Sequence, residues 1–202
     1  LLKNNGVFVI EVPHILDMLD NLFFDTIYHE HIFYFSVIAL KNLFEQRGLR
    51  IFRIEKLYFG PSGPPIRLFI CKTKAHYNSQ ASVQDMIDEE KNRGLNKLDP
   101  YNKFSDNVWG LKNNLLDLLG KIRDRHGKVI GYGAPAKGNT ILNTFDIGNE
   151  WLEAILEKNK LKVGLLSPGT HVPIKYEDTF DTSSFKYALL LSWNLIDYFL
   201  DK

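Results

Sequence analysis

The first quarter of the chain contains two kinds of apolar pattern. A continuous apolar run at 7–10 is typical of a strand buried in a parallel sheet, and apolar residues then recur at helical spacing within 14–24. A second helical pattern runs from Ser36, a residue type that caps helices, to Gly48, a residue type that ends them. These patterns predict a strand followed by two helices.

Two segments of alternating polar and apolar residues follow, at 49–59 and 65–72, around the break GPSGPP. They predict two antiparallel strands joined by a loop. Beyond them, Asp99 and Pro100 form a helix start, and apolar residues recur at steps of three and four as far as Ile122. We predict one long amphipathic helix, for which packing between two sheets is a better explanation than binding of a partner.

The last third of the chain alternates strand and helix signals. Strands are expected at 128–133, 152–156 and 187–193, and a helix at 134–145. This alternation predicts a parallel α/β unit. We therefore expect an α/β fold with a domain boundary near residues 75–80.

Composition narrows the choice of partners. The chain has 25 Lys and Arg against 24 Asp and Glu, so a small polar ligand fits better than nucleic acid or an anionic membrane. No apolar run approaches the roughly 20 residues that cross a bilayer, and no signal peptide pattern is present. The single cysteine, Cys71, excludes a multi-cysteine zinc site within this chain and is expected to be buried in a strand. A cytoplasmic location is expected.

The chain begins close to its first predicted strand. A parallel strand needs neighbours, which normally come from preceding βα units. We therefore expect this chain to be the back part of a longer protein, cut inside a domain.

A glycine turn is predicted at the end of the strand at 128–133. Gly131, Gly133 and Ala136 fit the pattern G-x-G-x-x-(G/A), in which a tight turn presents the free N–H groups of a helix start to an anion. The substrate-binding candidates at this turn are Gly131, Gly133, Ala134, Lys137, Gly138, Asn139 and Thr140.

Two interpretations of this turn remain open: a site for an anionic ligand such as a diphosphate, and a structural connection from strand to helix. A dinucleotide fits less well, because Glu157 follows Gly131 by 26 residues rather than about 20. The residue order of a P-loop is also absent. Further along, His171 follows the turn at Pro168–Gly169 and is either a ligand contact or a satisfied surface residue.

The segment YHEH at 28–31 concentrates side chains that carry protons. Histidine is the commonest general base, and a neighbouring carboxylate such as Glu30 can orient it. A phenol such as Tyr28 can hydrogen-bond an enolate oxygen while His31 takes a proton from the carbon beside a carbonyl. A structural role and a metal site remain as alternatives, although the spacing is not that of the zinc motif H-E-x-x-H.

Four stretches together resemble the C-terminal half of the sugar-nucleotide C-methyltransferases. They are FDTIYHEHIFYFS at 24–36, GYGAPAKGNTILN at 131–143, PGTHVPI at 168–174 and LSWN at 191–194. The resemblance covers essentially the whole chain. It implies the end of a class I methyltransferase-type sheet at 1–75, formed by a strand and an antiparallel hairpin, and a Rossmann-like C-terminal domain at 76–202.

The resemblance also implies a reaction. Such enzymes methylate the carbon beside the keto group of a nucleotide-linked 4-keto-deoxysugar, with S-adenosylmethionine as methyl donor. On this sequence His31 matches the base, Glu30 its orienting partner and Tyr28 the phenol near the keto oxygen. The main loop for the methyl donor and a zinc-binding domain would both lie upstream, in the remainder of the full-length enzyme. The fragment alone is then expected to be inactive.

One departure concerns the substrate pocket. Family members often carry a Gly-Gly-Ser-Leu-Arg-like stretch where this chain has GPSGPPIR, so Arg67 is kept as a substrate-binding candidate while prolines stiffen the loop. The sequence leaves open the sugar, the nucleotide base, the stereochemistry and the oligomeric state. The alternative function is a non-catalytic nucleotide-sugar or dinucleotide-binding module, and a nicotinamide oxidoreductase is a more distant one.

Overall fold

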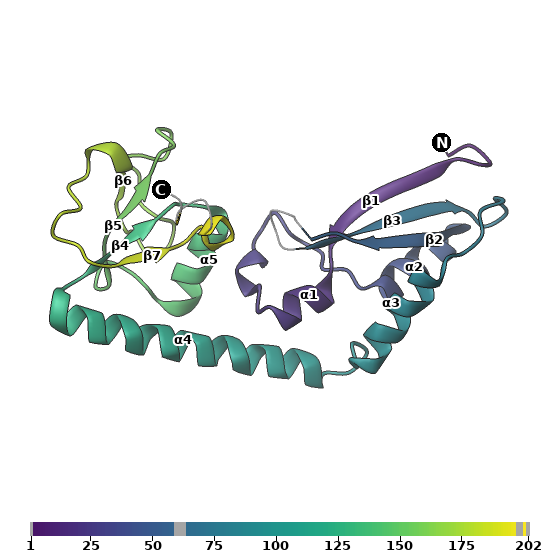
Figure 1. Cartoon of the computed structure of the whole chain (residues 1–202), viewed down its shortest axis with the longest axis horizontal. Coiled ribbons are helices and arrows are strands. Elements are labelled where there is room, and N and C mark those ends of the chain that lie inside the picture. Colours follow the sequence, from purple (N-terminus) through teal and green to yellow (C-terminus); the bar gives the residue numbers. More distant parts are fainter. Residues whose placement is uncertain (1, 59–63, 197–199, 201–202) are drawn as a thin grey trace. The chain divides into compact units, whose positions relative to one another are not determined.

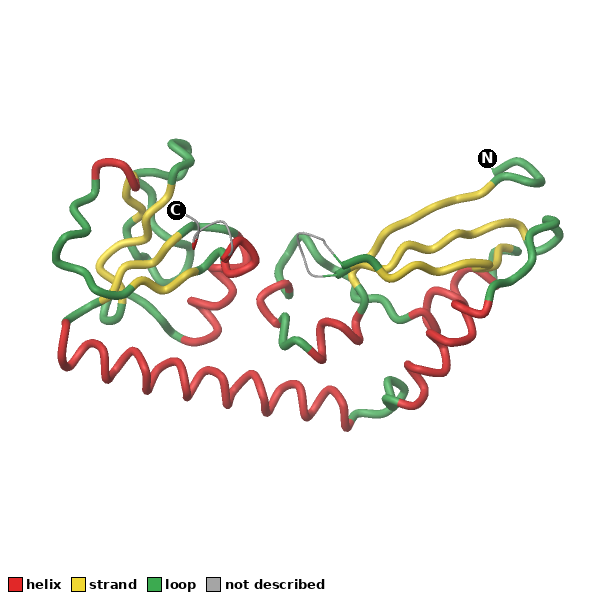
Figure 2. The backbone as a smooth tube through the Cα atoms, viewed as in Figure 1, coloured by secondary structure: helices red, strands yellow, loops and turns green. Residues whose placement is uncertain are grey.

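A computed structural model describes residues 2–58, 64–196 and 200 (Figures 1 and 2). The chain forms two compact units, each with its own β-sheet. The first unit comprises Leu1–Phe24 and His31–Val108, and the second comprises Asp25–Glu30 and Trp109–Lys202.

The sheet of the first unit has the strand order β1-β3-β2, and both pairings are antiparallel. Its strands are β1 (Val7–Pro13), β2 (Leu49–Lys56) and β3 (Pro65–Lys72). The predicted hairpin is therefore confirmed, and Cys71 is fully buried in β3 as expected. Most of the loop GPSGPP falls on residues 59–63, outside the described residues.

The prediction of a buried parallel strand at 7–10 is wrong in two respects. β1 runs antiparallel to β3 at the edge of this sheet, and Val7, Phe8 and Val9 are 36%, 44% and 47% exposed. An apolar run predicts a strand, but the direction of its partner depends on a segment far along the chain, which the run itself does not encode.

The first unit also contains the helices α1 (Ile15–Asp20), α2 (Val37–Glu45) and α3 (Ala81–Asn92). α2 and α3 pack on β2 and on each other (Figure 1). The core that they enclose includes Val37, Leu40, Ile51, Ile66, Leu68, Ile70, Met86 and Ile87.

The second predicted helix begins as expected. The Ser36 hydroxyl accepts a hydrogen bond from the N–H of Ala39 at 3.1 Å, which is the N-cap arrangement. The first helical pattern, at 14–24, is interrupted instead. Leu22 has a left-handed φ of 53°, and the chain continues as a separate 3₁₀ turn, η1 (Phe24–Thr26).

The long helix is confirmed as α4 (Asp99–His126). Its residues up to Val108 belong to the first unit and the rest belong to the second. In the second unit the Arg123 guanidinium lies 4.3 Å from the centre of the Trp151 ring. No helix within the described ranges combines the length and the apolar composition that a membrane crossing requires.

The division between the units lies further along the chain than the predicted boundary near 75–80. The reason is that α3 packs on β2 and α2, which places it with the first sheet. The assignment of 1–75 to a methyltransferase domain and of 76–202 to a Rossmann-like domain stays a prediction.

The second unit contains a parallel sheet with the order β6-β5-β4-β7, which confirms the predicted parallel α/β unit. Its strands are β4 (Val129–Tyr132), β5 (Leu152–Glu157), β6 (Ile174–Tyr176) and β7 (Ala188–Leu190). Helix α5 (Ala136–Phe145) connects β4 to β5, and 3₁₀ turns cover η2 (Glu177–Thr179) and η3 (Trp193–Leu195). β6 was not predicted, because its three residues Ile-Lys-Tyr contain no apolar run like the one that marks β7.

Candidate functional site

The YHEH segment is neither helix nor strand. Residues 28–30 form a bend and turn, and His31 begins an irregular stretch that leads to α2. Tyr28 and His31 are half-buried, whereas His29 and Glu30 are exposed. The four side chains are therefore not enclosed in a core. A catalytic role requires this accessibility.

Tyr28 has the properties of a neutral hydrogen-bond donor. Its ring meets the His29 ring edge-on, with the centres 5.9 Å apart. Burial, followed by the negative charges of Glu30 and Asp25, raises the pKa of the Tyr28 phenol above its ordinary value of 10.0. The phenol thus keeps its proton at neutral pH and can donate it to an oxygen.

The division between the compact units falls inside this segment. Tyr28, His29 and Glu30 belong to the second unit, and His31 belongs to the first. The predicted phenol and the predicted base are therefore carried by different units.

A buried acid, Asp25, was missed by the sequence analysis. It is only 2% exposed, and its carboxylate accepts a hydrogen bond of 2.6 Å from the indole N–H of Trp193. Burial raises the pKa of Asp25, although the Trp193 hydrogen bond and the positive charge of Lys137 act in the opposite direction. Asp25 and Trp193 lie within FDTIYHEH and LSWN, so the second unit joins these two motifs.

Lys137 belongs to the same cluster. Its ammonium lies 4.7 Å from the centre of the Trp193 ring. Burial lowers the pKa of Lys137, and the attraction to Asp25 partly offsets this effect. The charge predicted to meet a diphosphate is therefore already in the field of a buried carboxylate.

Close packing around the turn explains why its residues are glycines. A Cβ at Gly131 would approach Ile155 Cγ1 to 3.0 Å, and one at Gly138 would approach Leu191 Cβ to 3.0 Å. Gly133 has a φ of +80°, and a Cβ there would overlap the Ser192 hydroxyl. These observations favour the structural interpretation of the motif.

The carboxylate of Glu157, at the end of β5, accepts a hydrogen bond from one backbone N–H of this turn. It accepts hydrogen bonds of 2.9 Å from the N–H groups of Ala134, Lys158 and Asn159. Burial raises the pKa of Glu157, but these backbone donors and the nearby Lys162 together lower it by more, so the net pKa is below the ordinary value. The N–H of Ala134, one of the predicted substrate-binding residues, is therefore already hydrogen-bonded to the Glu157 carboxylate.

Helix α5 connects the glycine turn to the PGTHVPI motif. Asn143 donates hydrogen bonds to the carbonyl of Asn139 at 2.7 Å and to that of Pro168 at 2.9 Å. The half-buried residues Asn139 and Thr140 lie on the first turns of α5. The two motifs thus meet through Asn143, a residue that the motif analysis did not single out.

His171 is exposed and adopts a left-handed φ of 54°. Its N–H donates to the Ser167 carbonyl at 2.9 Å, and its carbonyl accepts from Asn149 at 3.2 Å. The backbone is therefore used to close the turn, while the side chain faces solvent.

Arg67 has acidic partners within the first sheet. In the antiparallel register it lies between Glu11 on β1 and Glu55 on β2. Its side chain donates to Glu11 at 2.7 Å and to Glu55 at 3.4 Å. The Glu11 hydrogen bond and charge raise the pKa of Arg67 further, so this cation is shared between two carboxylates rather than left open for a ligand.

A second buried network lies in the first unit and was also missed. Glu90 is 0% exposed and accepts hydrogen bonds from the N–H groups of Val37 at 2.5 Å and Ile38 at 2.9 Å. The His14 ring contacts Glu90 at 2.8 Å and Asp17 at 3.2 Å. The network fixes the start of α2, the helix that follows the YHEH segment.

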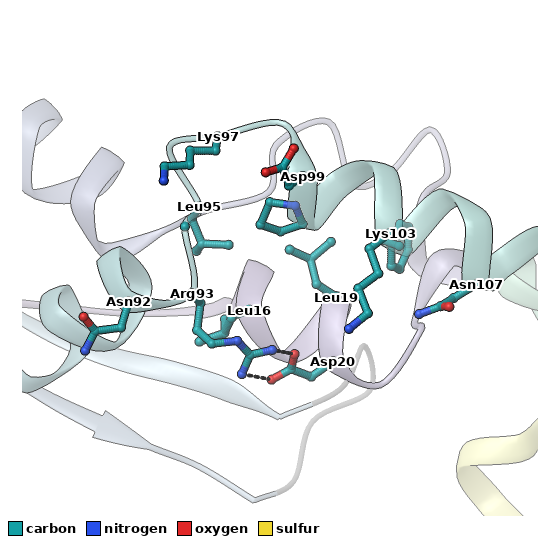
Figure 3. Close-up of a pocket in the computed structure, with 13 residues that line it drawn as sticks. Leu16, Leu19, Asp20, Asn92, Arg93, Leu95, Lys97, Asp99, Lys103 and Asn107 are labelled. Carbon is teal, nitrogen blue, oxygen red and sulfur yellow. Dashed lines mark hydrogen bonds and ion pairs between the residues drawn. The ribbon is translucent and has the colours of Figure 1, made fainter.

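The first unit also contains a cavity of about 490 Å³ beside α1 and the start of α4 (Figure 3). Leu16, Leu19 and Leu95 supply apolar lining, and Arg93 forms a two-point ion pair with Asp20 at its edge. The residues that line it include none of the predicted site residues. Within the described parts of the chain no group of three or more His, Cys, Asp or Glu side chains is arranged to hold a metal ion.

Comparison with known proteins identifies the family. The model of the family described as the C-methyltransferase C-terminal domain matches residues 61–202. C-methyltransferase NovU of Streptomyces niveus is 31% identical over 201 residues, which cover 100% of this chain and 47% of that protein. This chain belongs to the C-methyltransferase C-terminal domain family and spans about half the length of that relative.

Proposed function

We propose that the protein to which this chain belongs is an S-adenosylmethionine-dependent C-methyltransferase acting on the carbon beside the keto group of a nucleotide-linked 4-keto-deoxysugar. The observation that carries the proposal is the YHEH turn, where a phenol that keeps its proton lies three residues before a half-buried histidine. Family membership supports methyl transfer to carbon, and the name of the relative refers to that activity alone. A cytoplasmic enzyme of deoxysugar biosynthesis is the corresponding expectation.

His31 is the general base in this proposal. Its imidazole takes the proton from the carbon beside the ketone, and the electron pair of that C–H bond moves toward the keto oxygen. Tyr28 donates a hydrogen bond to that oxygen as negative charge develops on it, and Glu30 orients the imidazole and stabilises its charged form. S-adenosylmethionine, when bound, supplies a methyl group on a positively charged sulfur. The enolate carbon would form its bond to that methyl group as the sulfur–methyl bond breaks and leaves its electron pair on sulfur, the ketone would be restored, and His31 would release its proton to solvent.

The loop that holds the methyl donor is proposed to lie in the remainder of the full-length enzyme. A zinc-binding N-terminal domain is likewise proposed only for the full-length enzyme. We accordingly expect the 202-residue chain alone to show no methyl transfer.

Substitution of the base tests this function directly. In the full-length enzyme, His31→Ala should lower methyl transfer by about 10²–10⁴-fold, the usual contribution of a general base, while nucleotide-sugar affinity stays within a few-fold. His76→Ala is the control, because that histidine is exposed and lies outside the YHEH segment. Intact turnover in His31→Ala would reject the catalytic assignment.

A second measurement isolates the proton transfer. The wild-type enzyme should exchange the hydrogen beside the ketone with deuterium from D₂O, detected by NMR, and His31→Ala should not. Tyr28→Phe should slow the exchange by about 10²–10³-fold, as expected for loss of one donor to a developing oxyanion. Exchange at the wild-type rate in both variants would mean that another group removes the proton.

The nucleotide part of the substrate is proposed to bind at the glycine turn, where the positive end of the α5 helix dipole and the Lys137 ammonium favour a negative charge. Calorimetry of the chain with thymidine diphosphate tests this placement. Lys137→Ala should weaken the binding, whereas Lys128→Ala, at the opposite end of β4, should not. Absence of heat with the unchanged chain would remove the diphosphate from this turn.

A further inference from the structure

We propose that Asp25 is a positioning residue that anchors residues 25–30 to the second unit through Trp193, and thereby fixes Tyr28 and Glu30 for the reaction. This inference rests on the proposed function. It assigns to the C-terminal unit a part in building the acid–base group, in addition to any part in holding the substrate.

The first observation is the membership of this short segment. Residues 25–30 belong to the second unit, whereas the chain on both sides of them, up to Phe24 and from His31, belongs to the first. A six-residue segment has no core of its own, so specific contacts must hold it there. The Trp193–Asp25 hydrogen bond, which joins residues 168 positions apart, is such a contact.

The second observation is the burial of the acid. Asp25 is 2% exposed, and its neighbour Thr26 is 5% exposed. A buried carboxylate is costly unless hydrogen bonds or positive charge compensate it, and here the indole N–H and Lys137 do so. Because the carboxylate is enclosed, it does not touch a substrate, so its effect must act through the segment that it holds.

The partners of Asp25 are themselves firmly placed. Trp193 follows Leu191, which is 1% exposed, and Leu191 packs closely against Gly138 at the start of α5. Lys137 precedes that glycine and places its ammonium over the Trp193 ring. The anchor is thus attached to two elements of the second core, the first turn of α5 and the segment after β7.

The position of Asp25 is transmitted to Tyr28 over three residues. Residues 24–26 form the 3₁₀ turn η1, and the N–H of Tyr28 donates to the carbonyl of Thr26 at 3.1 Å. This local hydrogen bonding limits how far Tyr28 can move relative to Asp25. Loss of the anchor should therefore displace the phenol and Glu30 without removing either.

Hydrogen–deuterium exchange of the 202-residue chain tests the anchor without any activity. In Asp25→Ala the amides of residues 26–30 should exchange at least tenfold faster, while those of α5 keep their wild-type rates. Asp25→Asn retains an oxygen that can accept from Trp193 and should restore most of the protection. Trp193→Phe should reproduce the effect of Asp25→Ala, and the double variant should be no worse than either single one. The control is Asp181→Ala, at an exposed acid of the same unit.

Kinetics of the full-length enzyme test the role in positioning. Asp25→Ala should lower kcat by at least tenfold and leave KM within about threefold, and Asp25→Asn should recover most of kcat. If Asp25→Ala does not fold, Trp193→Phe provides the same comparison, because it removes the donor and leaves the acid in place. Wild-type exchange at 26–30 and wild-type kcat in these variants would overturn the anchor. A third outcome separates the two proposals. If the variants show faster exchange at 26–30 but the wild-type full-length enzyme transfers no methyl group, the anchor is supported and the proposed function is rejected.

Discussion

Glu90 shows how a single buried acid can organise the first unit. Its two carboxylate oxygens receive the first N–H groups of α2, and the His14 ring approaches the same carboxylate at 2.8 Å. No side-chain nitrogen or oxygen that is buried in the described residues lacks a hydrogen-bond partner. Removing the acid would therefore leave buried donors without acceptors.

Glu90→Ala is predicted to destabilise the chain by about 3–5 kcal/mol, the usual cost of removing one partner from a buried charged pair. The matched control is Glu89→Ala on the same helix. Glu89 pairs with Lys56 at 2.8 Å on the surface, so its loss should cost about 1 kcal/mol or less. Urea unfolding followed by circular dichroism gives both values, and equal costs would contradict the structural role of Glu90.

The same network predicts a dependence of stability on pH. Burial lowers the pKa of His14, but the hydrogen bonds and charges of Asp17 and Glu90 raise it more, so the net pKa exceeds the ordinary value of 6.5. Folding therefore favours the protonated ring. Its contribution is fully present below pH 6.5 and is lost as the pH rises through the raised pKa.

His14→Gln should consequently be more destabilising at pH 6 than at pH 9. The measurement is the difference in unfolding free energy between wild type and variant across this range. A difference that grows toward high pH would show that the ring is neutral in the folded state.

At the scale of elements, the backbone of the second unit depends on glycines for two separable reasons. Gly169 and Gly127 both have a φ of +79°. A Cβ at Gly127 would meet no atom within 4 Å, whereas one at Gly169 would overlap the side chain of Asn143. The two positions thus share conformational strain and differ only in available space.

Gly127→Ala should cost about 1–2 kcal/mol, the price of placing an L-residue in the left-handed region. Gly169→Ala should cost about 2 kcal/mol more, because the displaced Asn143 would lose its hydrogen bonds to Asn139 and Pro168, each worth about 1 kcal/mol. Thermal unfolding of the two variants gives the comparison. Equal shifts would mean that Asn143 moves aside without loss.

Local signals in the sequence were sufficient for most elements. The Ser36 cap, the Asp99–Pro100 start of α4 and the alternation in β2 and β3 are all properties of neighbouring residues. The direction of β1 was not predictable in this way, because it depends on pairing with β3 far along the chain. The break at Leu22 was missed for a related reason, since an apolar residue with left-handed φ carries no turn signal of its own.

The same distinction between local and long-range features applies to the candidate site. The YHEH segment is contiguous, so its residue types were visible in the sequence. Asp25 and Trp193 are 168 positions apart, and His14 and Glu90 are 76 apart, so no spacing rule connects them. For Asp25 and Trp193 the only signal in the sequence was that each lies inside one of the four motifs that carry the family resemblance.

At the scale of the whole chain, each unit has its own sheet and its own buried residues. Cooperative units of this kind can open separately, and amide exchange reports the free energy of each opening. Glu90 lies in the first unit and Gly169 in the second. The two destabilising substitutions therefore provide a probe of whether the units unfold independently.

We predict that Glu90→Ala speeds amide exchange in β2, β3, α2 and α3 while leaving β4 and β5 at their wild-type rates. Gly169→Ala should have the reverse effect, since its consequences are confined to α5 and the parallel sheet. Residues 25–30 provide the sharpest readout: although they lie between two stretches of the first unit in sequence, their exchange should follow Gly169→Ala. If they respond to Glu90→Ala instead, the segment that carries Tyr28 and Glu30 is held by the first unit, and the Asp25–Trp193 hydrogen bond does not determine where it resides.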